Sequence, residues 1–107
     1  MPNWNDVRWN SGVARQAEWS LRDRARLLDE TIDLRMQLAD RARREWRGPY
    51  RDEFDRKLNH MVSRGRQLAQ EMRAKADEIR RATARAEAEQ RRREEERRRW
   101  EREHEDD

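Results

Sequence analysis

Two long runs of apolar residues at helical spacing are separated by a Gly-Pro pair at positions 48 and 49, and this pattern limits the fold more than any other feature. In the first run, apolar residues recur every three or four positions from Ala14 to Trp46, which places them along one side of an α-helix. The second run begins near Tyr50 and keeps a similar alternation as far as Ala86. The pattern predicts two amphipathic helices.

The residues between the two runs, Trp46-Arg47-Gly48-Pro49, are typical of a tight turn. Gly48 can adopt the left-handed conformation that ends a helix, and Pro49 suits the first position of the next helix. Because so short a connection makes neighbouring helices run antiparallel, we predict an all-α helix-turn-helix hairpin. Trp46 should lie at its closed end.

Both expected helices carry more apolar surface than a single neighbouring helix covers. In the first helix, the row from Leu27 to Leu38 lies about a third of a turn from the main row. In the second, Val62, Ala69, Ala76 and Thr83 are expected to flank the main seam. Such wide apolar arcs favour a four-helix bundle made from two hairpins. The residues expected to form the hairpin and dimer contacts are Leu21, Leu28, Ile32, Leu34, Leu38, Leu58, Met61, Leu68, Met72 and Ile79.

Three regions are expected along the chain. Residues 1–12 form an N-terminal lead-in whose Trp4 and Trp9 rings pack on the helices, and residues 13–86 form the hairpin with its turn at 46–49. Residues 87–107 form a charged tail that is partly helical or disordered. The tail has 7 Lys/Arg and 10 Asp/Glu, and its blocks of alternating sign support i, i+4 pairs that each contribute about 0.2–0.5 kcal/mol.

Composition and residue types argue against catalysis and against metal binding. With 33% hydrophobic and 48% charged residues, the chain is expected to need a partner to complete its core. The absence of cysteine excludes disulfides and thiolate ligands, and His60 and His104 are too far apart in sequence to form a metal motif. No catalytic constellation emerges. We therefore expect no enzyme, no cofactor, no metal and no small-molecule substrate.

The sequence also gives expectations about membrane and nucleic-acid partners. No run approaches the roughly 20 apolar residues of a transmembrane segment, and the N-terminus lacks the features of a Sec signal peptide. Arginines cluster around the turn, but acidic residues among them neutralise that charge, so we do not expect nucleic acid as a partner. The alternative kept open is a cytosolic helical interaction module with Arg-mediated nucleic-acid association. The arginines are Arg41, Arg43, Arg44, Arg47 and Arg51, and the acids are Glu45, Asp52, Glu53 and Asp55.

A helix, the sequence Trp46-Arg47-Gly48, and a second helix that opens with Tyr50 and Phe54 together resemble the WXG (Trp-x-Gly, ESAT-like) family of small type VII secretion proteins. The resemblance covers roughly residues 10–90. It implies a four-helix bundle formed as a homodimer or as a heterodimer with a sister WXG-like protein. It also implies actinobacterial-type export of the folded protein from the cytoplasm through the type VII ATPase and channel.

By this resemblance, Trp46 and Gly48 would form half of a composite export signal. The other half in the family is a C-terminal Tyr-x-x-x-Asp/Glu, and this chain departs from it because Tyr50 is its only tyrosine. Trp100, with His104 four residues later, is the nearest candidate for a tail signal. Three readings stay open: a sister protein supplies the tail signal, Trp100 is a degenerate version, or this chain is not exported.

Overall fold

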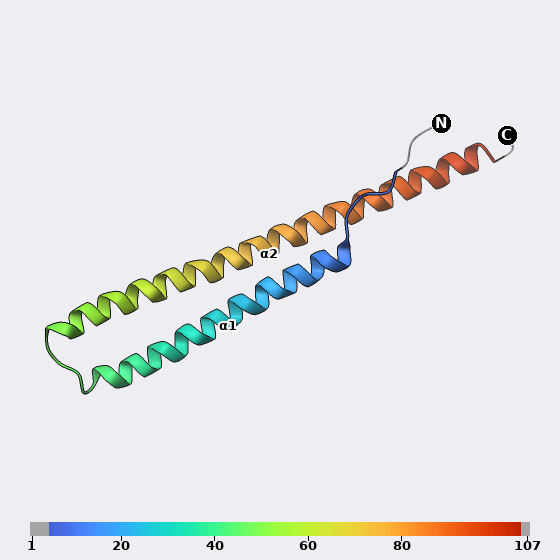
Figure 1. Cartoon of the computed structure of the whole chain (residues 1–107). Helices are drawn as coiled ribbons and strands as arrows, with labels where there is room; N and C mark the ends of the chain where they lie inside the picture. The colour runs from blue at the N-terminus through green and yellow to red at the C-terminus, as the bar shows by residue number, and fades with distance from the viewer. Residues whose placement is uncertain (1–4, 106–107) are drawn as a thin grey trace.

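The chain folds as two α-helices that lie side by side and antiparallel (Figure 1). The computed structural model describes residues 5–105, apart from the side chain of Pro49. Helix α1 spans Ser11–Arg43 and α2 spans Pro49–Glu103. The predicted all-α hairpin is confirmed, and within residues 5–105 no strand is present. The molecule is a thin rod with extents of 89 × 16 × 13 Å.

The helix boundaries follow from local chemistry. The Asn10 side chain caps α1 by accepting a hydrogen bond from the Val13 N–H at 3.0 Å. Arg41 and Arg43 lie in the last turn of α1, where positive charge complements the helix dipole. Pro49 occupies the first turn of α2, where its missing N–H has no helical partner to lose.

The connection between the helices differs in detail from the expected turn. Helix α1 ends at Arg43, three residues before Trp46, so that residues 44–48 form the connection. Gly48 has a positive φ of 113°, but its ψ of −175° is extended and differs from the expected left-handed helical value. Because Pro49 follows, an extended ψ is what Gly48 must adopt. Gly48 therefore caps the start of α2 and does not close α1.

The seam between the helices is made largely of small side chains. Ala69, Ala76 and Thr83, which we expected to flank the seam, are buried at its centre. A Cβ atom added to Gly65 would lie 2.6 Å from Cδ1 of Ile32, so the two helices meet closely here. The spacing of most buried residues by seven positions is typical of paired helices. The buried residues are Ala14, Ala25, Ile32, Ala39, Leu58, Ala69, Ala76 and Thr83.

Helix α2 is much longer than α1, with 55 residues against 33, and it continues past the start of α1. Residues 5–10 run back along this extension (Figure 1). The indole N–H of Trp9 donates to the Thr83 hydroxyl at 3.1 Å. The expected packing of Trp4 lies outside the described residues. No helix within residues 5–105 is long and apolar enough to cross a membrane.

Candidate protein-binding face

One side of the hairpin, which we call the ion-pair flank, is crossed by five ion pairs between α1 and α2. One of them joins Arg22 and Asp77, whose nitrogen and oxygen lie 2.8 Å apart. In each pair the two residues lie at similar sequence distances before and after the turn. Antiparallel packing therefore brings them to the same level along the rod. The five pairs are Arg15–Glu87, Arg22–Asp77, Asp29–Arg73, Asp33–Arg66 and Arg43–Asp55.

The Arg22–Asp77 pair also changes the acidity of both its members. The hydrogen bond from Arg22, followed by its charge, lowers the pKa of the Asp77 carboxyl below its ordinary value. The same bond raises the pKa of Arg22, to which Glu18 adds a second hydrogen bond. These side chains are well exposed to solvent, so the pairs fix the register of the helices more than they stabilise the fold.

On the opposite side, which we call the apolar flank, no ion pair joins the two helices among the residues that the structure describes. Two open hollows lie along it, with volumes of about 390 and 350 Å³. The apolar lining of the first includes Leu21, Leu68 and Met72, beside Glu71 and Lys75. The apolar lining of the second includes Leu38, Phe54 and Met61, beside Arg35. Leu28 lies one heptad after Leu21 and therefore belongs to the same row. The apolar flank thus consists of Leu21, Leu28, Leu38, Phe54, Met61, Leu68 and Met72.

The structure distributes the ten expected packing residues unevenly. Ile32 and Leu58 are buried in the seam, whereas Leu34, Leu38 and Leu68 are 57%, 53% and 46% exposed. The remaining five, Leu21, Leu28, Met61, Met72 and Ile79, are partly covered. The hairpin contact therefore buries mainly small residues and leaves most of the large aliphatic side chains partly or largely exposed. Exposed apolar faces of this kind are typical of interaction surfaces in proteins.

The closed end of the hairpin gathers the residues of the expected export motif. The Trp46 and Phe54 rings pack at a centroid distance of 5.1 Å with planes 59° apart, and Trp46 remains 38% exposed. Tyr50 is 71% exposed and makes no comparable ring contact among the described residues. Two of the five clustered arginines, Arg43 and Arg51, form ion pairs with Asp55. That pairing reduces the positive charge offered to a nucleic acid.

The C-terminal part of α2 is held by pairs within the helix. Hydrogen bonds from Arg92 and Arg93 lower the pKa of Glu89 to about 2. The helix ends where the His104 ring stacks on the Trp100 ring at 4.1 Å, and His104 Nδ1 lies 2.8 Å from the Trp100 carbonyl oxygen. Trp100, the candidate tail signal, therefore lies at the far end of the rod from Trp46.

The described residues offer little to a metal ion. His60 is exposed on α2, far along the helix from His104. No group of three or more His, Cys, Asp or Glu side chains within residues 5–105 is placed to hold a metal. The many carboxylates are instead shared out among arginines.

Two features of the site went unnoticed in the sequence. The ion-pair flank was detectable in principle, because opposite charges occur at similar distances before and after the turn. The binding of residues 5–10 to α2 has no periodic signal. Comparison with protein-family models, with characterised proteins and with solved structures finds no match to this chain.

Proposed function

We propose that this chain is a protein-binding helical hairpin, which pairs through its apolar flank with a second hairpin to form a four-helix bundle. The partner is a second copy or a sister protein. We further propose that the chain is a WXG-like substrate or co-secreted partner of a type VII secretion system. It would act through binding alone and leave the cytoplasm without a Sec signal peptide.

The observation that carries the binding role is the exposure of Leu38 and Leu68 on the apolar flank, beside a seam of alanines. Burial of each large aliphatic side chain contributes about 1.5–3 kcal/mol. A lone hairpin forgoes that contribution along its whole apolar flank. A second hairpin laid on this flank recovers it and yields the packing of a four-helix bundle.

The export role is supported by the closed end. Trp46 and Gly48 lie together in the connection between two amphipathic helices, and Trp46 is partly open to solvent. Gly48 adopts a backbone conformation that other residues rarely take, which ties the glycine of the motif to the start of α2. Both residues are therefore accessible to a receptor at one tip of the rod.

A pair of matched variants tests the binding role. Leu68→Glu places a charge on the apolar flank, whereas Gln70→Glu places the same charge beside the ion-pair flank. We expect the wild-type chain and Gln70→Glu to sediment as dimers, alone or mixed with a sister protein, and Leu68→Glu to sediment as a monomer. Equal masses for the two variants would exclude the apolar flank as the interface.

The export role needs a separate experiment in the native host. The amount of protein in the medium is compared between the parent strain and a strain lacking the type VII ATPase. We expect loss of the secreted protein without the ATPase, and a marked decrease for Trp46→Ala. Undiminished secretion without the ATPase refutes the export role while leaving the binding role intact.

A further inference from the structure

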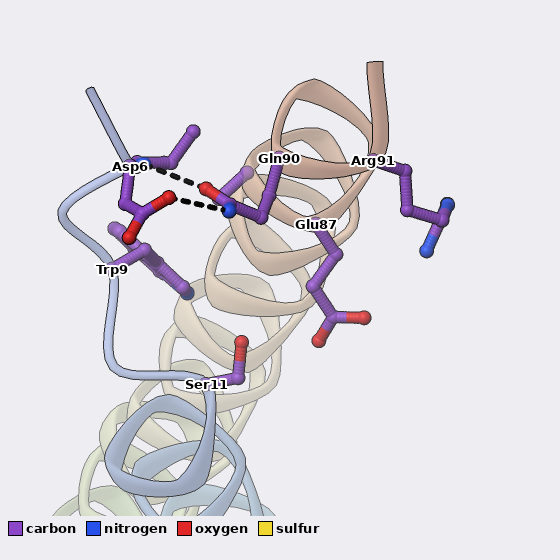
Figure 2. A pocket seen from close by; sticks show the side chains of 8 residues that line it. Asp6, Trp9, Ser11, Glu87, Gln90 and Arg91 are labelled. Atoms are coloured by element: carbon purple, nitrogen blue, oxygen red, sulfur yellow. Dashed lines mark hydrogen bonds between the residues drawn. The ribbon is translucent and has the colours of Figure 1, made fainter. Parts of the chain in front are cut away.

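Residues 5–10, which we call the strap, form neither helix nor strand and lie on the part of α2 that reaches beyond α1 (Figure 2). The strap is largely extended, with one local turn in which the Trp9 N–H donates to the Val7 carbonyl oxygen at 3.1 Å. The side-chain amide of Gln90 binds the strap at two points. Its oxygen accepts the Val7 N–H at 2.7 Å, and its nitrogen donates to the Asp6 carboxylate at 3.0 Å. This pairing recognises a backbone N–H together with the acidic side chain before it.

Further contacts extend the recognition to both ends of the strap. The Trp9 indole N–H donates to the buried Thr83 hydroxyl, which itself donates to the Ile79 carbonyl oxygen. At the other end, Arg93 donates to the Asn5 carbonyl oxygen at 2.7 Å, and Arg97 lies 3.7 Å from Asp6. The strap is therefore held by a carboxylate, a backbone N–H, an indole and a carbonyl.

The strap replaces α1 on the same stripe of α2. Thr83, Gln90 and Arg97 are seven residues apart and continue the row of the buried Ala69 and Ala76. An extended segment advances about 3.3 Å per residue, whereas a helix advances 1.5 Å per residue. Five strap residues therefore suffice to follow α2 from residue 83 to beyond residue 90.

The hold on the strap is incomplete. Trp9 remains 42% exposed, and the contacts of Asn5 and Asp6 are made at the solvent-facing surface. A hollow of about 450 Å³ lies between the strap and α2, lined by Val7 and Trp9 on one side and by Ala86 and Gln90 on the other. In Figure 2 the Arg91 side chain points away from the strap. A segment held over a hollow by hydrogen bonds that are exposed or only partly buried belongs to the low-stability end of a structure.

We propose that the stripe Thr83–Gln90–Arg97 is a recognition groove for an extended segment with an aspartate and a tryptophan three residues apart, and that the strap is its detachable internal occupant. The partner is then a protein segment of the same chemistry, which binds when the strap lifts. This groove is separate from the apolar flank, so the inference does not depend on the proposed function.

The first test exchanges the roles of two side chains in the full chain. Gln90→Glu removes the donor to Asp6 and Glu94 and sets a new carboxylate against both of them. We therefore expect the solvent-exchange rate of the Val7 amide, measured by NMR, to rise about tenfold. Asp6→Asn in the same chain restores a donor, and the rate should return to near the wild-type value. An unchanged rate in Gln90→Glu, or a failure of the double variant to recover, overturns the docking of the strap.

The second test asks whether the groove accepts a segment from outside. A labelled peptide of residues 5–11 is titrated by fluorescence anisotropy into the full chain and into Asp6→Ala/Trp9→Ala, in which the strap is weakened and the groove is intact. We expect binding to the variant to be about tenfold tighter, because the wild-type strap competes at high effective concentration.

The control peptide carries the same two alanines and should bind neither chain. Equal binding of the native peptide to both chains would place it outside the groove. No binding to the variant at millimolar peptide would show that the stripe is no recognition groove. Either result overturns the proposal.

Discussion

The two flanks of the hairpin lie on either side of one alanine seam, yet they perform different tasks. The ion-pair flank carries five charged pairs between the helices, and the apolar flank carries mainly aliphatic, thioether and aromatic side chains, with Arg35, Glu71 and Lys75 beside them. Exposed ion pairs contribute little free energy but penalise a wrong register, because a shift sets like charges together. Apolar surface contributes free energy without a preferred register. One flank thus aligns the hairpin, and in the proposed four-helix bundle the other would supply the attraction for a partner.

The largest expected effect separates two neighbouring side chains of α1. Ile32→Ala removes a side chain that is 4% exposed in the seam and should lower the free energy of unfolding by about 2–5 kcal/mol. Leu34→Ala changes a side chain that is 57% exposed and should cost less than about 0.5 kcal/mol in the isolated chain. Urea unfolding at low protein concentration measures both. Equal losses would mean that the seam and the exposed face are not distinct.

The next effect concerns the turn, which keeps the helices in the register that separates the flanks. Gly48→Ala forces a Cβ atom onto a residue with a φ of 113° and should cost about 1–3 kcal/mol, although nothing lies within 4 Å to clash with it. Gly12→Ala is the control, because Gly12 lies inside α1 and its new Cβ would only touch Asn10. Thermal unfolding should show a lower midpoint for Gly48→Ala alone. A stabilised Gly48→Ala chain would contradict the glycine-only conformation.

A smaller effect tests how closely the helices approach at the seam. Gly65→Ala gains helix propensity but drives its Cβ into Ile32, so we expect a net loss of about 1 kcal/mol. Ile32→Val removes the Cδ1 atom that would be struck. In that background Gly65→Ala should become neutral or stabilising, as measured by a double-mutant cycle of urea unfolding. Additive effects of the two changes would mean that the helices are further apart.

The smallest effect concerns the ion-pair flank and depends on pH. Because the folded chain lowers the pKa of Asp77, the folded state releases this proton more readily than the unfolded state. The resulting stabilisation is complete above the unfolded value of about 4 and is lost as the pH falls through the folded value. Asp77→Asn should flatten this part of the pH profile of the thermal midpoint. An unchanged profile in Asp77→Asn would show that the Arg22–Asp77 pair does not contribute to the pH dependence of stability.

The sequence predicted the helices and the reversal well because both depend on local chemistry. Apolar spacing and the Gly48-Pro49 pair are local signals, and each helix has one dominant face. The rotation of α2 was predicted less well. The sequence pattern predicts that rows of Leu and Met form most of the seam. In the structure Ala69, Ala76 and Thr83 lie at its centre, because small side chains allow the backbones to approach. Only the packing of two helices together reveals that preference.

The candidate sites show the same limit. Trp46 and Gly48 were placed at the closed end from the turn alone, and the surplus apolar surface was anticipated from the width of the apolar arc. The docking of the strap could not be anticipated. It depends on Gln90 meeting Asp6 and Val7 across more than eighty residues, and no spacing rule connects such residues.

The strap and the C-terminal end of α2 leave the rod at the same end, opposite the turn. A force that pulls the two ends of the chain apart would therefore separate the helices from their open end towards the turn. Contacts would yield one after another from the strap towards Trp46, each under its own small force. The same fold pulled between its closed end and its tail would resist as a whole. The direction of pulling, as well as the free energy of folding, thus sets how easily this hairpin is unfolded by force.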